Sequence, residues 1–134
     1  MIVVDTNILC YLFLDSERTA QAEQALARDA EWAAPPLWRI ELRNVLAGQV
    51  RRGGLGLADA RRIAEEAEGL MAGGEYHADS GTVLALAADS GCSAYDCEFV
   101  AVARSLGAPL VTVDRQVLVA FPDLAVPLAE YADS

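Results

Sequence analysis

Asp5 is the first of four acidic residues whose positions suggest a role in catalysis. It follows an uninterrupted apolar run at residues 1–4, which is too short for a helix and is typical of a buried parallel strand. In an open α/β sheet, ligands bind outside the carboxyl ends of the strands, so Asp5 is expected at such a crevice. A structural role is the alternative, because Asp5 or Thr6 could cap the helix that follows.

Asp114 repeats this arrangement near the end of the chain. Residues 109–113 form another apolar strand, and Asp114 stands at its carboxyl end. If this strand lies beside the first strand where the strand order reverses, Asp5 and Asp114 face one crevice.

Glu41 lies on a predicted helix at residues 38–52. It shares a helical stripe with Leu37 and Val45, which predicts that its side chain points into the apolar face. Charged residues avoid such positions unless they are paired or bind a metal. The alternative is an ion pair with Arg39 or Arg43, although residues two apart point to different sides of a helix.

Asp96 stands at the start of another predicted helix, which ends at Gly107. The segment from Ser93 to Asp96 also matches a capping box, in which the two side chains satisfy free backbone groups at the helix start. Asp96 therefore has both a structural and a catalytic interpretation.

Composition indicates one domain that spans residues 1–134. The chain has 54% hydrophobic residues, enough for a substantial core at this length. It lacks a long apolar run and the features of a signal peptide, so we expect a soluble, cytoplasmic protein with no membrane association. The net charge of −10 is unusual for a nucleic-acid-binding protein, but a metal ion can bridge an acidic site to an anionic substrate.

Missing residue types exclude several classes of chemistry. All ten basic residues are arginine, and without lysine neither a P-loop nor a Schiff-base site can form. His77 is the only histidine and no nucleophile motif surrounds it, so a hydrolase triad is not supported. The three cysteines lack paired spacing, which argues against disulfides and a zinc site and favours small core residues.

Predicted strands and helices alternate along the chain, which indicates a three-layer α/β/α domain with a mainly parallel sheet. Proline at position 127 favours an edge position for the last strand. Beyond those already named, strands are predicted at residues 31–34, 75–78 and 124–128, and helices at residues 8–14, 16–28, 57–71 and 80–90.

Four segments, taken in order, resemble the motifs of the PIN-domain family, and most closely those of the short bacterial VapC-type toxin ribonucleases. Each segment is short, but the set in this order is specific and covers nearly the whole chain. The segments are Val4–Asp5–Thr6–Asn7, residues 39–46 around Glu41, residues 93–97 around Asp96, and Thr112–Val113–Asp114.

This resemblance implies a PIN-like fold with strand order 3-2-1-4-5 and a Mg²⁺ or Mn²⁺ site formed by the four acids. It also implies an endoribonuclease that hydrolyses single-stranded or looped RNA, forms a homodimer and is inhibited by a cognate antitoxin. The expected metal-binding and catalytic residues are Asp5, Glu41, Asp96 and Asp114.

Phosphodiester hydrolysis needs an activated water and stabilisation of extra charge on the phosphate. Divalent cations held by carboxylate oxygens do both. Asn7 and Thr112 are candidates to hold a carboxylate or a phosphate oxygen, although Thr112 is equally explained as a strand-forming residue.

Other functions remain open at this stage. Phosphoryl transfer with Asp5 as nucleophile is disfavoured, because position 7 is asparagine and no lysine is present. A PIN-fold nuclease that acts on DNA or in RNA processing is not distinguished by these motifs. A catalytically silent binding module, in which the acids are only caps and ion pairs, is the third alternative.

Overall fold

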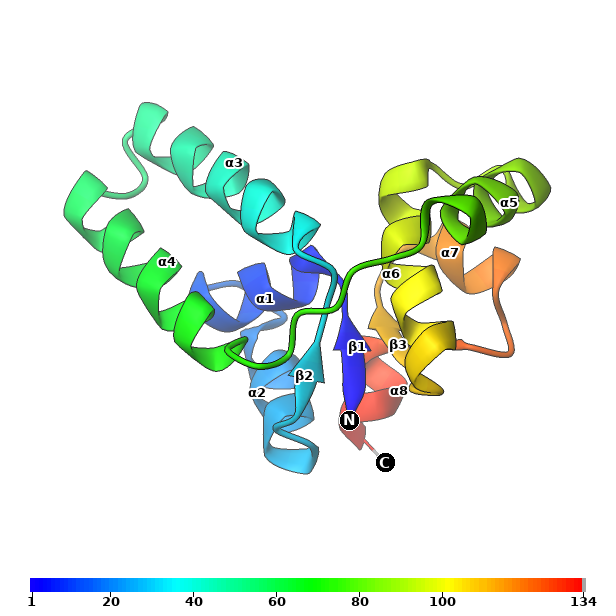
Figure 1. Ribbon diagram of the computed structural model, residues 1–134. Helices are drawn as coiled ribbons and strands as arrows, with labels where there is room; N and C mark the ends of the chain where they lie inside the picture. The colour runs from blue at the N-terminus through cyan, green and yellow to red at the C-terminus, as the bar shows by residue number, and fades with distance from the viewer. Residues whose placement is uncertain (134) are drawn as a thin grey trace.

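The computed structural model describes residues 1–133 and shows a parallel sheet surrounded by helices (Figure 1). The sheet has the order β2-β1-β3-β4, and each neighbouring pair is parallel. Its strands are β1 (Ile2–Val4), β2 (Trp32–Ala33), β3 (Leu110–Thr112) and β4 (Ala125–Pro127). The α/β class is confirmed, and β1 lies beside β3 as predicted. β4 occupies an edge, where the missing N–H of proline is tolerated.

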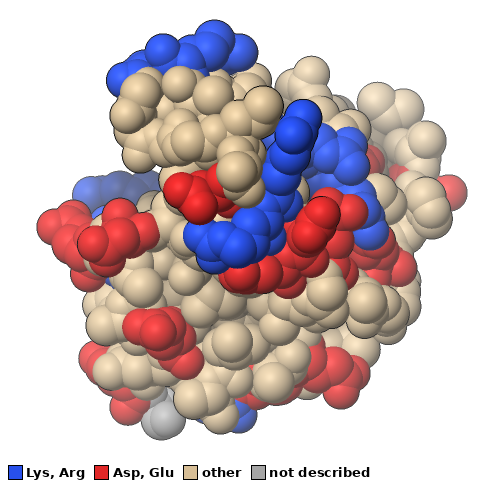
Figure 2. Space-filling view, turned by 90° about the vertical axis from the view of Figure 1, so that its left-hand side faces the viewer, with Lys and Arg blue, Asp and Glu red and all other residues tan. Residues whose placement is uncertain are grey.

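The helices lie on both sides of this sheet. Figure 1 shows α3 and α4 as a hairpin on the left, and α5, α6 and α7 on the right. Figure 2 shows the α3–α4 side, where arginine and acidic side chains lie next to one another. The helices are α1 (Thr6–Phe13), α2 (Thr19–Arg28), α3 (Leu37–Arg51), α4 (Leu57–Leu70), α5 (Ser80–Ser90), α6 (Ala94–Leu106), α7 (Arg115–Ala120) and α8 (Leu128–Asp133).

The predicted strand order 3-2-1-4-5 needs one correction. The segment at residues 75–78 forms only an isolated bridge between Ala34 and Glu75, so the sheet has four strands and its first predicted member is absent. The remaining order is as predicted. Pairing with this segment cannot continue past Ala34, because the next donor on that edge of β2 would be residue 36, which is proline and has no N–H.

Two short helices were not predicted. Helix α7 begins directly after Asp114, whose side chain accepts a hydrogen bond from the N–H of Val117 at 3.0 Å. Helix α8 begins directly after Pro127 and buries Leu128 and Tyr131. Each has six residues, too few for a helical pattern to be recognised in the sequence.

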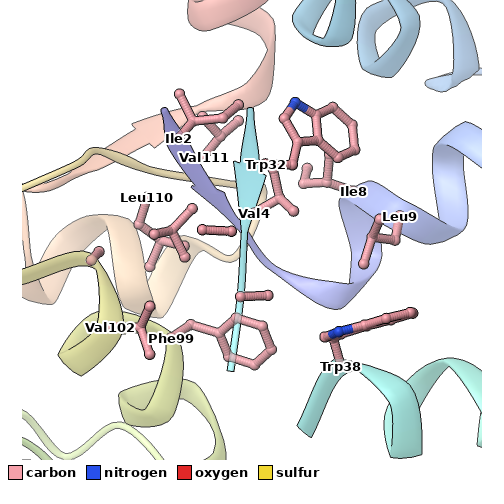
Figure 3. Close-up of a cluster of buried hydrophobic side chains, with 14 of the residues drawn as sticks. Ile2, Val4, Ile8, Leu9, Trp32, Trp38, Phe99, Val102, Leu110 and Val111 are labelled. Atoms are coloured by element: carbon pink, nitrogen blue, oxygen red, sulfur yellow. The ribbon is translucent and has the colours of Figure 1, made fainter. Parts of the chain in front are cut away.

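Strands and helices share one hydrophobic core (Figure 3). The side chains of β1 are at most 1% exposed, and in Figure 3 they lie between Trp32 of β2 and Leu110 of β3. Trp38 and Phe99 approach this group from α3 and α6. This packing fixes where β1 and β3 end, and therefore where the acids that follow them emerge.

The cysteines and the helices of residues 1–133 bear on two expectations from composition. All three cysteines are free and buried, as predicted for small core residues. Among the helices described, none has both the length and the apolar character needed to cross a membrane.

Gly74 should be essential where the segment that follows α4 packs against β2. Its carbonyl accepts from the N–H of Ala34 at 3.0 Å, and an added Cβ would overlap the carbonyl oxygen of Trp32. Gly74→Ala should therefore lower the free energy of unfolding by about 1–3 kcal/mol. Gly69→Ala is the matched control, because that position in α4 has open space and alanine should stabilise it by up to ~1 kcal/mol. Equal urea midpoints for the two variants would contradict this prediction.

Candidate active site

All four acids predicted from the sequence line one pocket at the carboxyl ends of β1 and β3. The pocket has a volume of about 80 Å³ and brings together residues from both ends and the middle of the chain. Its lining consists of Asp5, Thr6, Asn7, Glu41, Asp96, Phe99, Leu110, Thr112, Asp114 and Val117. The fold thus brings four acids that are far apart in the sequence together in one cavity.

Asp5 uses its two carboxylate oxygens differently. Oδ1 accepts from the N–H of Ile8 at 3.3 Å and caps α1, whereas Oδ2 accepts a short hydrogen bond from the hydroxyl of Thr112. The same Thr112 hydroxyl accepts from the N–H of Asp114 at 3.0 Å. Thr112 is only 1% exposed, so it connects the ends of β1 and β3 beneath the pocket.

Asp114 and Asp96 also lie at helix starts. Asp114 caps α7 through Oδ1, and Asp96 is the third residue of α6, where its N–H donates to the side chain of Ser93 at 3.1 Å. The capping interpretations of the sequence are therefore correct locally. Capping does not prevent these acids from lining the pocket. The cap of α7 uses one oxygen of Asp114, and at the start of α6 it is the N–H of Asp96 that donates to Ser93.

Glu41 lies at the edge of the face of α3 that packs against the core. The buried face of α3 consists of Trp38, Leu42 and Leu46, and Glu41 is half-buried beside it. The predicted stripe does face inward, because Leu37 and Val45 pack against the core, although the fully buried positions belong to the neighbouring stripe. The result for Glu41 is an orientation into the pocket.

The ion pair proposed for Glu41 is not the interaction observed. Arg39 instead pairs with Glu75 at 2.7 Å and with Glu68 at 2.8 Å. The partner of Glu41 is the hydroxyl of Thr6, which donates to Oε1 at 2.6 Å. Glu41 therefore enters the pocket without a compensating cation among residues 1–133.

Thr6 was predicted only as a possible cap, and its contact with Glu41 was not predicted. Thr6 is 7% exposed, and it shares the inward face of α1 with Leu9 and Cys10, a spacing that could have revealed it. Asn7 lines the pocket, but its side chain is exposed and holds no carboxylate within the described chain, so a contact with a phosphate oxygen stays a prediction.

The acids affect one another's ionisation. Burial raises the pKa of Asp5 to about 6, and the charge of Asp114 adds to this increase, whereas hydrogen bonds from Thr112 and Ile8 oppose it. Burial also raises the pKa of Asp96, with a further contribution from Asp114. Below them, burial and the charges of Asp5 and Glu41 raise the pKa of the Cys10 thiol to about 11, so it stays neutral.

The donor set fits a hard divalent cation. The pocket offers carboxylate and hydroxyl oxygens and has no histidine or cysteine among its lining residues, which favours Mg²⁺ or Mn²⁺ over zinc. As the side chains stand in residues 1–133, no three acids form a ready group of ligands. Binding would therefore require small side-chain movements or bridging waters, which Mg²⁺ commonly retains.

A parallel α/β domain with carboxylates around its switch point defines the class of the protein. Within this class, residues 2–124 match the family model of the PIN domain, and the chain belongs to that family. The resemblance seen in the sequence motifs is thereby confirmed.

Two relatives from Pyrobaculum aerophilum extend this assignment. The chain is 33% identical over 129 residues to Ribonuclease VapC3, and the match covers 94% of this chain and 98% of that protein. The crystal structure of PAE2754 is similar with a TM-score of 0.77 and 25% identity, covering 99% and 97% of the two chains. The likeness to Ribonuclease VapC3 thus extends over nearly the whole chain.

The raised pKa of Asp5 should make stability depend on pH. Its folded-state pKa of about 6 lies above the ordinary value of 3.8, so the native state binds the proton more tightly than the unfolded chain does. This contribution is complete below the lower value and is lost as pH rises through the higher one. From well below pH 3.8 to well above pH 6, the wild type should lose about 3 kcal/mol of unfolding free energy relative to Asp5→Asn.

Urea unfolding of both proteins across this pH range measures the difference. Asparagine keeps the cap of α1 and can still accept from Thr112, so the variant differs mainly by its inability to titrate. Stability curves that run parallel for the two proteins would contradict the prediction.

Proposed function

We propose that this protein is a Mg²⁺- or Mn²⁺-dependent endoribonuclease and the toxin of a toxin–antitoxin pair. The observation that carries the proposal is the convergence of Asp5, Glu41, Asp96 and Asp114 on one pocket with no lysine or histidine in it. The likeness to Ribonuclease VapC3 supports RNA as the substrate. Action on RNA in the cytoplasm is part of the same proposal.

The pocket residues have separate roles in this mechanism. Asp5, Asp96 and Asp114 would hold the cation, which supplies an activated water and stabilises charge on the phosphate. Thr112 holds Asp5 in place, and Thr6 orients Glu41 by binding one of its oxygens. The other oxygen of Glu41 is then available to orient the attacking water.

Hydrolysis by water determines the product ends. Water attacks the phosphorus, the bond to the 3′ oxygen breaks, and the leaving oxygen takes up a proton. The ribose 2′ hydroxyl takes no part, so the products carry a 5′-phosphate and a 3′-hydroxyl. A 2′,3′-cyclic phosphate would indicate another mechanism.

The groove between α3 and α4 provides a surface for the antitoxin. It has a volume of about 350 Å³, and its apolar floor includes Leu57, which is 54% exposed. Arg51 and Arg61 line the same groove, and neither forms an ion pair within residues 1–133. This combination favours an acidic, amphipathic segment of the partner.

Asp114→Asn should distinguish a nuclease from a binding module. Asparagine caps helices about as well as aspartate, so folding should be preserved, but loss of a metal-binding charge should lower the rate of RNA cleavage by ~100-fold or more. Asp79→Asn is the matched control, because Asp79 caps α5 at 3.0 Å in the same way and lies outside the pocket. Asp96→Asn should behave like Asp114→Asn.

The assay uses purified proteins and a structured RNA with Mg²⁺, with and without EDTA, followed by mapping of the product ends. Mn²⁺ should also raise the melting temperature of the wild type and of Asp79→Asn more than that of Asp114→Asn. The nuclease proposal fails if Asp114→Asn and wild type cleave equally, or if cleavage continues in EDTA.

A homodimer is the expected assembly. Large apolar side chains such as Leu57 and Val119 remain 54% and 79% exposed on helices, and such surfaces invite partners. Light scattering at micromolar concentrations should give about twice the chain mass of 14.3 kDa. A monomer throughout would remove the dimer from the proposal and leave the catalytic assignment intact.

A further inference from the structure

A second groove adjoins the acidic pocket. It has a volume of about 500 Å³, in the ~300–1,000 Å³ range of sites for drug-sized ligands, which is enough for one nucleotide. Glu41 lines both this groove and the pocket, so the two lie on either side of one side chain. The groove residues are Leu37, Ile40, Glu41, Arg43 and Asn44 of α3 and Tyr95 of α6.

Tyr95 presents an exposed aromatic side chain directly beside the site. It is 66% exposed and precedes Asp96, which lines the acidic pocket. Across the groove, Ile40 is 63% exposed at the start of α3. Two large apolar side chains at the mouth of a polar pocket form a surface suited to the face of a planar ring.

Arg43 supplies a positive charge in the same groove. Arg39 and Arg62 are occupied by ion pairs with acids, whereas Arg43 is exposed and has no such partner among residues 1–133. An acidic protein needs a cation of this kind to hold an anionic substrate close to its carboxylates. Asn44 lies one position further on and can both donate and accept hydrogen bonds.

We propose that this groove binds an unpaired nucleotide next to the scissile phosphate, with its base stacked on Tyr95. Arg43 contacts a neighbouring phosphate, and Asn44 contacts the base edge. A base can reach Tyr95 only when it is free of its own stack, so the groove selects single-stranded RNA over duplex. This inference rests on the proposed ribonuclease function, and it assigns substrate-binding residues beyond the four acids.

Binding can be measured without cleavage in the Asp114→Asn background. Fluorescence anisotropy with a short labelled single-stranded oligoribonucleotide of mixed sequence should show a roughly 5- to 100-fold weaker Kd for Tyr95→Ala, and little change for Tyr95→Phe. Leu84→Ala is the matched control, because Leu84 is also 66% exposed but lies outside the groove. The annealed duplex should bind more weakly and be insensitive to Tyr95.

Arg43 is tested through the salt dependence of the same binding. Arg43→Gln should reduce the slope of log Kd against log salt concentration by about 0.7, the value for one phosphate contact on a single strand. Arg51→Gln on the same helix is the control and should leave the slope unchanged, since Arg51 does not line this groove.

Cleavage by the same variants separates this inference from the function on which it rests. In the active background, Tyr95→Ala should raise KM with little change in kcat. If the wild type cleaves RNA but Tyr95→Ala has the same Kd and KM as its parent, the groove does not bind the nucleotide and the nuclease proposal is unaffected. If binding depends on Tyr95 but the wild type cleaves no RNA, the groove binds RNA and the nuclease proposal is contradicted. A change from dimer to monomer by light scattering in Tyr95→Ala would identify the groove as a contact between copies and overturn the inference.

Discussion

The repulsion between carboxylates that emerge from neighbouring parallel strands is the constraint around which this structure is arranged. β1 and β3 must pair for the core to form, and their pairing brings Asp5 and Asp114 to one edge of the sheet. Helix starts offset part of this repulsion, because α1 and α7 each direct backbone N–H groups at one of these acids. Burial, with a smaller contribution from the charge of Asp114, raises the pKa of Asp5.

Two threonine hydroxyls complete the arrangement. Thr112 binds Asp5 and the backbone of Asp114, and Thr6 binds Glu41, so buried donors fix carboxylates without neutralising them. An arginine in either position would have satisfied the charge and closed the pocket to a cation. The available arginine, Arg39, is instead held away by two other acids. The pocket therefore retains an excess of negative charge, which a divalent cation would relieve.

The distribution of arginines bears on how a protein with a net charge of −10 could bind the proposed RNA substrate. Paired arginines such as Arg62 contribute little to attraction at a distance, because their charge is matched locally. On α3 and α4, the unpaired Arg51 and Arg61 line the groove between the helices, and Arg43 lines both this groove and the one next to the acids. One helix, α3, can thus serve both substrate and partner.

The sequence by itself determined the parallel α/β class and the four acids. An apolar run that ends in aspartate predicts both a buried strand and an acid at its carboxyl end, and the helical patterns around Glu41 and Asp96 gave the other two. It left the choice between cap and catalytic residue open at Asp5, because capping geometry is local whereas the pocket depends on contacts across the sheet. Helical spacing already predicted that Glu41 points inward, but only the tertiary structure decided that its partner is Thr6, because that contact depends on how α1 packs beside α3. The tertiary structure also showed that residue 75 lies beside the end of β2. Because proline follows there, the two segments form one bridge and not a ladder.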